Sequence, residues 1–366
     1  MGPCMSLPSL VKRGARATCL SMLQPSPKFM TQARPLALAR WLWVVAGLIV
    51  VMVVVGGITR LTESGLSITE WKPVTGAVPP LSEAEWRLAF EQYKQIPEYE
   101  AFNRGMTLAG FKAIYFWEYV HRLLGRVIGL AFALPLAWFW IKRQIPAGYK
   151  PRLLALLALG GLQGAIGWWM VASGLSVRTD VSHLRLTVHL LTALVILAGV
   201  AWTALDLQRL GRDPLASAAR LTPLAMVALV LLFVQLGYGA LTAGLNAGHA
   251  FDSWPLMGDS LFPAGGLPAG AGGAEMVDNP VVVQFVHRWL AFIAGAALLA
   301  LAWRARQAMR PAALAVAGLL VLQIALGVAT LWTGVRIDVA VWHQLNAALL
   351  LLASVLTAHA VGRPRP

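Results

Sequence analysis

The sequence predicts an all-α polytopic membrane protein, built as two tandem, pseudo-symmetric four-helix bundles. Three observations predict this fold: the composition, eight long apolar stretches and a weak duplication of the chain. Hydrophobic residues make up 58% of the 366 residues and charged residues 13%, whereas soluble domains average roughly 45–50% and about 25%. The composition therefore excludes a soluble enzyme, a disordered scaffold and a collagen-like chain.

Eight stretches are long and apolar enough to span a bilayer, whose core of roughly 30 Å needs about 20 helical residues. They lie at about 39–58, 114–141, 151–173, 186–206, 221–241, 281–303, 311–334 and 339–360. The second is the least uniform, because charged residues and a histidine precede its apolar run.

The distribution of basic residues predicts the topology. A net charge of +14 first suggests a nucleic-acid partner, but 18 of the 30 Lys and Arg residues lie in the two terminal segments and three short loops. Cytoplasmic loops carry such an excess. We therefore expect both termini to face the cytoplasm or matrix, and the long loops at about 59–113 and 242–280 to lie outside. No nucleic-acid partner is expected.

The chain divides into a tail and two related halves. Residues 38–210 are predicted to form the first bundle and 211–366 the second, because motifs recur in order with offsets that fall from 166 to 154. The matching pairs are 120–122 with 286–288, Gln163 with Gln323, Gly167 with Gly327, and His189 with His343. With four spans per half, both halves enter the membrane from the same side, which is the parallel-repeat arrangement.

Residues 1–37 are predicted to be an N-terminal tail that is disordered or removed. The tail contains Arg, Lys and Ser but no acidic residue, as in a transit peptide. An upstream start, with Met30 the true initiator, is the open alternative. Both cysteines, Cys4 and Cys19, lie in this tail, so the body has no thiol pair for a disulfide or a metal site.

Four histidines lie near the outer ends of even-numbered spans: His121 and His189 in the first half, His287 and His343 in the second. An ionisable residue inside a membrane is a functional candidate by default, and neutral imidazole is a common axial ligand of haem iron. Two facing helices can hold a planar macrocycle between one histidine each. The alternative is that all four form hydrogen bonds across helices. The other three histidines, His183, His249 and His359, are expected to be solvated.

Charged residues beside these histidines add to the predicted sites. Glu118 lies three residues before His121, on the same helix face, and could exchange protons during chemistry. The alternative for Glu118 is an ion pair with Arg122. The residue that matches Glu118 in the second half is Gln284, so only the first half is expected to be catalytic.

Three arginines and two glycine pairs are also candidates for the haem sites. Arg122, Arg126 and Arg288 are predicted either to pair with haem propionates or to snorkel to the outer interface. The spacing of Gly125 with Gly129, and of Gly160 with Gly164, predicts close helix approach.

Several motifs resemble the haem A synthase family, over about residues 39–360. Residues 56–67 (GGITRLTESGLS) resemble the signature after the family's first span. Residues 118–122 (EYVHR) resemble its Glu-x-x-His-Arg motif, and residues 284–288 (QFVHR) the second-half counterpart. Residues 244–248 (GLNAG), with Trp254-Pro255 and Met257-Gly258, are similar to the third loop signature. The outer loops lack cysteines, as in the proteobacterial and mitochondrial branch.

The resemblance implies a function and a site for each half. The first bundle would bind haem O as substrate between His121 and His189, with Glu118 as the essential acid. The second bundle would hold a haem b cofactor between His287 and His343. The family oxidises the C8 methyl of haem O to a formyl group by successive hydroxylations and loss of water.

The same resemblance implies partners and a location. The partners would be haem O synthase and a ferredoxin or similar electron donor. The protein would lie in the lipid bilayer, and a homo-oligomer is a further alternative. The location would be a bacterial inner (plasma) membrane or, alternatively, a mitochondrial inner membrane.

Two other functions compete with this one. A di-haem cytochrome acting only in electron transfer would also need four histidines, but it would favour haems at different depths. A transporter with parallel repeats would favour charged residues near the bilayer midplane, and the spans lack acidic residues at mid-depth.

Overall fold

The secondary-structure elements of the protein are all helices within the residues that its computed structural model describes, which are 33–362 apart from 74, 269 and 271. Eight helices are long and apolar enough to cross a membrane, which confirms the predicted fold class. They are α3 (Pro35–Leu61), α5 (Leu108–Ile141), α6 (Lys150–Val171), α7 (His183–Arg212), α8 (Pro223–Gly244), α10 (Pro280–Ala305), α11 (Arg310–Trp332) and α12 (Ile337–Val361). The tail predicted over 1–37 lies outside the described residues as far as residue 32, and Met30 and both cysteines lie there too.

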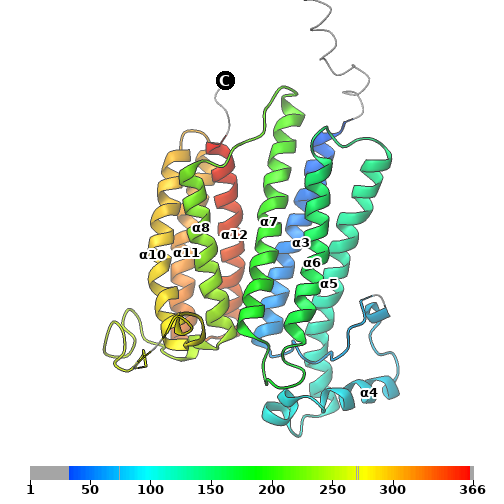
Figure 1. Ribbon diagram of the computed structural model, residues 1–366, viewed down its shortest axis with the longest axis vertical. Coiled ribbons are helices and arrows are strands. Elements are labelled where there is room, and N and C mark those ends of the chain that lie inside the picture. The colour runs from blue at the N-terminus through cyan, green and yellow to red at the C-terminus, as the bar shows by residue number, and fades with distance from the viewer. Residues whose placement is uncertain (1–32, 74, 269, 271, 363–366) are drawn as a thin grey trace, which may run out of the picture.

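The membrane helices stand side by side in two groups (Figure 1). Helices α3, α5, α6 and α7 form one group, and α8, α10, α11 and α12 form the other. A single cluster of buried apolar side chains runs through both groups and includes Leu42, Leu197, Leu298 and Leu351. Because lipid tails are as apolar as these side chains, the cluster stabilises the bundle by close packing rather than by exclusion of water.

Local chemistry sets the starts of the membrane helices. The side chains of Thr107, Ser182, Thr222 and Asn279 accept hydrogen bonds from backbone N–H groups in the first turns of α5, α7, α8 and α10. Such caps satisfy N–H groups that have no partner within the helix. Proline occupies the first turn of α3, α6, α8, α10 and α11, where its missing N–H costs nothing.

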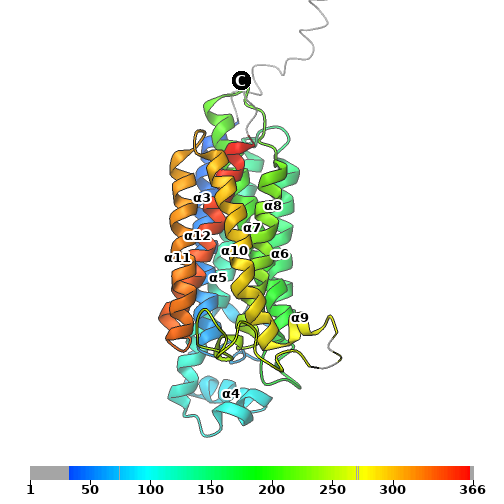
Figure 2. The ribbon, with the colours of Figure 1, turned by 90° about the vertical axis from the view of Figure 1, so that its left-hand side faces the viewer.

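The two long loops lie at one end of the bundle, and the start of α3 and the end of α12 lie at the other (Figures 1 and 2). At this second end the Arg34 N–H donates to the Gln144 carbonyl, and the Arg220 N–H donates to the Gly362 carbonyl, both at 2.9 Å. We call the first end the long-loop end and the second the terminal end. Each half therefore enters and leaves at the terminal end.

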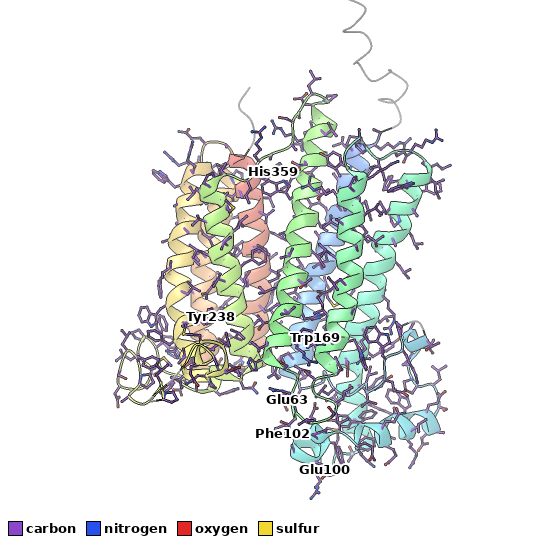
Figure 3. All side chains as sticks on the ribbon, viewed as in Figure 1. Glu63, Glu100, Phe102, Trp169, Tyr238 and His359 are labelled. Atoms are coloured by element: carbon purple, nitrogen blue, oxygen red, sulfur yellow. The ribbon has the colours of Figure 1, made fainter. Side chains whose placement is uncertain are left out.

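The first long loop folds into a compact unit, residues 62–107, which we call the first-loop module. It contains α4 (Glu83–Tyr93), the 3₁₀ turn Thr75–Ala77 and the π turn Tyr99–Asn103. The module projects beyond the membrane helices (Figure 2), and Glu100 and Phe102 lie at its tip (Figure 3). Helix α5 begins six residues earlier than predicted, and its added turns carry Phe111, on which Phe90 of α4 stacks at 4.9 Å.

A buried carboxyl group makes the first-loop module sensitive to pH. Glu98 is 4% exposed and accepts a hydrogen bond from Tyr93 Oη at 2.9 Å, and burial raises its pKa from 4.5 to about 8. The folded module therefore holds a proton that the unfolded chain loses above pH 4.5, so its stability falls as pH rises from 4.5 to about 8. Amide hydrogen exchange at residues 83–107 should therefore become faster between pH 4.5 and about 8. The increase should exceed the pH dependence that exchange shows in an unfolded chain. Glu98→Gln should remove this pH dependence of the exchange rate. A wild-type exchange rate that changes with pH no more than the variant's would contradict the prediction.

Two of the three histidines expected to be solvated are buried and paired instead. His183 Nε2 lies 2.8 Å from Asp278 Oδ1 near the long-loop end, and His359 Nε2 lies 2.8 Å from Asp206 Oδ1 at the terminal end (Figure 3). Both pairs join the first half to the second, because each aspartate comes from the other half. Only His249 is exposed as expected.

Candidate functional site

Each of the four predicted histidines packs against a glycine on the neighbouring membrane helix. A Cβ atom built on the glycine would lie 2.9–3.1 Å from the histidine Cε1 atom, closer than nearly all real Cβ contacts. The four pairs are Gly56 with His121, Gly167 with His189, Gly239 with His287, and Gly327 with His343. A larger residue at these positions would therefore push the imidazole away from the backbone of the neighbouring helix, most of all at Gly167, where the distance is 2.9 Å.

A glutamine amide lies beside three of the four imidazoles. Gln163 Nε2 lies 3.1 Å from His189 Nδ1, and Gln235 Nε2 lies 3.1 Å from His287 Nδ1. Gln323 Nε2 lies 3.3 Å from His343 Nδ1 and 3.2 Å from His343 Nε2. Each glutamine precedes the contact glycine by four residues, which places both on one helix face.

Two of the glutamines hold both the ring and the backbone of their histidine. Gln163 Nε2 and Gln235 Nε2 each also donate to the backbone carbonyl of the histidine that they contact, at 2.9 Å. The amide oxygens of the same two glutamines are buried with no partner among the described residues. The glutamines therefore fix the position of the imidazole rings through their amide nitrogens.

The spacing of the second-half pair fits an iron held between two histidines. The ring centres of His287 and His343 are 6.5 Å apart, with their planes at 82°. Two imidazoles bound to one metal at about 2 Å each place their ring centres roughly 6 Å apart. A small metal ion fits less well, because within the described residues no three His, Cys, Asp or Glu side chains gather as a metal site.

Glu118 forms the ion pair with Arg122 that was the alternative for it. Its Oε1 atom accepts from Arg122 Nη2 at 2.6 Å and Nε at 3.0 Å. Its Oε2 atom accepts from Ser67 Oγ and from the Ile68 N–H, each at 2.7 Å. Glu118 accepts all four hydrogen bonds and fastens the start of the first-loop module to α5, one turn from His121.

The three predicted arginines bind backbone carbonyls of the outer loops. Arg122 donates to Ile68 and Glu70, and Arg126 to Lys72 and Pro73. Arg288 does the same in the second half, donating to the carbonyls of Phe251, Ser253 and Leu256. These hydrogen bonds hold the outer loops against the helices that carry the histidines.

Gln284 takes the place of Glu118 in the second half. Its Nε2 atom donates to the Phe251 carbonyl at 2.9 Å, so it also fastens an outer loop. The two halves thus use the same pair of positions, three residues before the histidine and one after it, for the same purpose. They differ in charge, because only the first half has a carboxylate there.

Sequence reasoning missed two of the contact glycines, Gly56 and Gly239, and the glutamine Gln235. The missed signal is a Gln-x-x-x-Gly spacing at 163–167, 235–239 and 323–327. The close approach predicted at Gly129, Gly160 and Gly164 is wrong, since a Cβ atom there would meet none of the described residues within 4 Å.

The glycine contacts predict a position-specific effect of alanine. On α11, Gly327 faces His343 at 3.1 Å, whereas a Cβ on Gly318 meets nothing within 4 Å among the described residues. Nine residues separate the two positions, so they lie on opposite faces of the helix. Gly327→Ala should displace the imidazole and lower haem retention by about tenfold or more, whereas Gly318→Ala should leave it unchanged. Haem per protein, measured as the pyridine haemochrome, tests this, and equal retention in both variants counts against it.

Comparison with known proteins agrees with these features. A family model described as "Cytochrome oxidase assembly protein" (COX15-CtaA) matches residues 39–355. A protein named Heme A synthase from Rhizorhabdus wittichii is 60% identical over 343 residues, covering 93% of this chain and 97% of its own. Proteins with the same name from Sphingopyxis alaskensis and Erythrobacter litoralis are 55% and 54% identical, covering 94% and 90% of this chain and 97% and 98% of their own.

Proposed function

The chain belongs to the COX15-CtaA family of cytochrome oxidase assembly proteins, and from that premise we propose that it makes haem A from haem O, binding haem O in its first half and haem b in its second. It is a multi-pass enzyme of the bacterial inner membrane, an oxidoreductase of haem A synthesis. The long-loop end faces away from the cytoplasm, as the basic residues at the terminal end predict.

One observation carries the proposal: two histidine pairs, each ring packed against a glycine, one pair in each group of helices. Two axial imidazoles are what the protein must supply to an iron whose other four ligands come from a porphyrin. The amides of Gln163 and Gln235 hold the rings and the backbone of His189 and His287 in place.

The charge difference between the halves supports the division of roles. Glu118 places a carboxylate one turn from His121, whereas Gln284 cannot exchange a proton at the matching place in the second half. Oxidation of a methyl group releases protons, which a nearby carboxylate can take up. Electron transfer alone needs no such group, so the second half suits a cofactor that only passes electrons.

In the first half, His121 and His189 hold haem O by its iron and so fix which edge of the substrate faces the protein. The reaction converts the C8 methyl of haem O to a formyl group by successive hydroxylations and loss of water. Glu118 holds or accepts a proton at its carboxylate oxygens, and Arg122 and Arg126 keep the first-loop module closed over the site. Haem b, when bound in the second half, supplies one-electron transfer. Haem O synthase supplies the substrate, and a ferredoxin or similar donor supplies electrons.

Deletion of the gene tests this function in the cell. Extracts of the deletion strain should contain haem O and no haem A on chromatography, because the substrate accumulates when its oxidation stops. Expression of the intact chain should restore haem A, whereas expression of the His189→Ala variant should not. Normal haem A in the deletion strain rules out the proposed function.

A further inference from the structure

The four histidine sites share one design, and one of them departs from it. In α6, α8 and α11 the residue four positions before the contact glycine is Gln163, Gln235 or Gln323. In α3 the corresponding residue, four positions before Gly56, is Met52. The ring nitrogens of His121 accordingly make no hydrogen bond within the described part of the chain, unlike those of the other three.

The ring position of His121 matches that at two of the other sites. From the Cβ position of Gly56, the His121 atoms Cε1, Nδ1 and Nε2 lie at 3.1, 3.6 and 3.9 Å. The corresponding distances are 3.1, 3.7 and 3.9 Å for Gly239 with His287, and 3.1, 3.6 and 3.9 Å for Gly327 with His343. The fourth site, Gly167 with His189, is tighter, at 2.9, 3.4 and 3.7 Å. The missing amide therefore distinguishes His121 from two sites whose rings lie at the same distances from their glycines.

The missing amide weakens the hold on one ligand of the first-half pair. The glutamine Nε2 atoms contact the imidazole nitrogens of His189, His287 and His343 and so fix the orientation of each ring. Loss of such an outer partner of a ligating histidine typically costs about 10- to 100-fold in metal affinity. The thioether of Met52 has no N–H to donate and lies on a flexible side chain. The methyl group of Met52 packs toward Gly125 of α5, 3.5 Å from the Cβ position there. His121 is thus held by its glycine contact alone, whereas its partner His189 also has Gln163.

We propose that His121 is the exchangeable axial ligand of the haem in the first half, and that Met52 is the positioning residue that makes it so. This inference rests on the proposed function, because it presumes haem iron between His121 and His189. The bond from iron to His121 breaks and a small neutral ligand takes the vacated position, with no change in oxidation state. The position opens on the face that α5 covers, where Glu118 lies one turn away. His189, His287 and His343, each with a glutamine, stay bound.

Carbon monoxide binding to the reduced, purified full chain with both haems bound tests this. Wild-type protein should bind carbon monoxide at the first-half haem only. Met52→Gln supplies the missing amide and should lower the affinity for carbon monoxide about 10- to 100-fold, with a stronger low-spin spectrum. Met52→Leu, which keeps an apolar side chain of similar size, should bind carbon monoxide like the wild type.

The reverse exchange tests the same idea without relying on the fold of the Met52 variants. Gln235→Met should make His287 exchangeable, so that the second-half haem gains carbon monoxide binding. Unchanged binding in Met52→Gln, or no gain in Gln235→Met, overturns the inference and leaves the proposed function standing. A first half that takes up no haem when loaded with haem O overturns the proposed function, and the haem-to-protein ratio reports that outcome separately.

Discussion

Replacing His287 or His343 with alanine should remove the low-spin haem b spectrum from the purified protein. The two ring centres lie 6.5 Å apart with their planes at 82°. In the proposed site each ring would supply one ligand to the haem iron, and loss of either would leave the iron with one. We expect haem b content to fall at least tenfold, because ligand loss adds to the cost of an unfilled space beside Gly239 or Gly327. Optical spectra of the reduced protein and its pyridine haemochrome measure the change.

The first-half histidines provide the matched control. His121→Ala or His189→Ala should leave the haem b spectrum largely in place and abolish conversion of haem O. The contacts of these rings are with Gly56, Gly167 and Gln163, all in the first half, so their removal does not disturb the second pair. Loss of the haem b signal in a first-half variant contradicts the assignment of haem b to the second half.

The membrane helices were predictable because apolar length alone defines them, but their ends were not. Helix α5 begins at Leu108 and α7 runs on to Arg212, beyond the apolar stretches predicted at 114 and 206. These extra turns lie outside the lipid-spanning part and are stabilised by tertiary contacts. Phe111, for example, is buried under α4, and an apolar run in the sequence does not predict such a tertiary contact.

The four candidate ligands were predictable because a histidine inside a membrane stands out against an apolar background. Their surroundings were harder to predict, because the glycine contacts join residues on different helices. The Gln-x-x-x-Gly spacing marks three of the glycines, but it does not tell which histidine each of them meets. The pair of His359 with Asp206 joins residues 153 positions apart. The sequence also left two alternatives for Glu118. The positions of Arg122, the Ser67 hydroxyl and the Ile68 N–H in the structure show that the ion pair forms.

Replacing Glu118 should abolish turnover and loosen the first-loop module. Glu118 is 3% exposed and accepts all four of its hydrogen bonds from α5 and residues 67–68. Removing one partner of a buried ion pair typically costs about 3–5 kcal/mol. We therefore expect faster hydrogen exchange at residues 67–73 in Glu118→Ala, with haem O conversion lowered roughly a hundredfold or more if the carboxylate also serves as proton acceptor.

A second variant separates the proton role of Glu118 from its fastening role. Ser67→Ala removes one hydrogen bond to Oε2 but keeps the carboxylate and its pair with Arg122, so it should loosen the loop mildly and lower turnover less than tenfold. If Glu118 only holds the loop in place, the loss of turnover should be proportional to the increase in hydrogen exchange in Ser67→Ala, Glu118→Gln and Glu118→Ala. If it exchanges protons, Glu118→Gln should lose turnover far beyond its effect on exchange. The second half supports this expectation, because Gln284 fastens its loop without a carboxylate, so fastening by itself does not require the charge that the first half keeps beside His121.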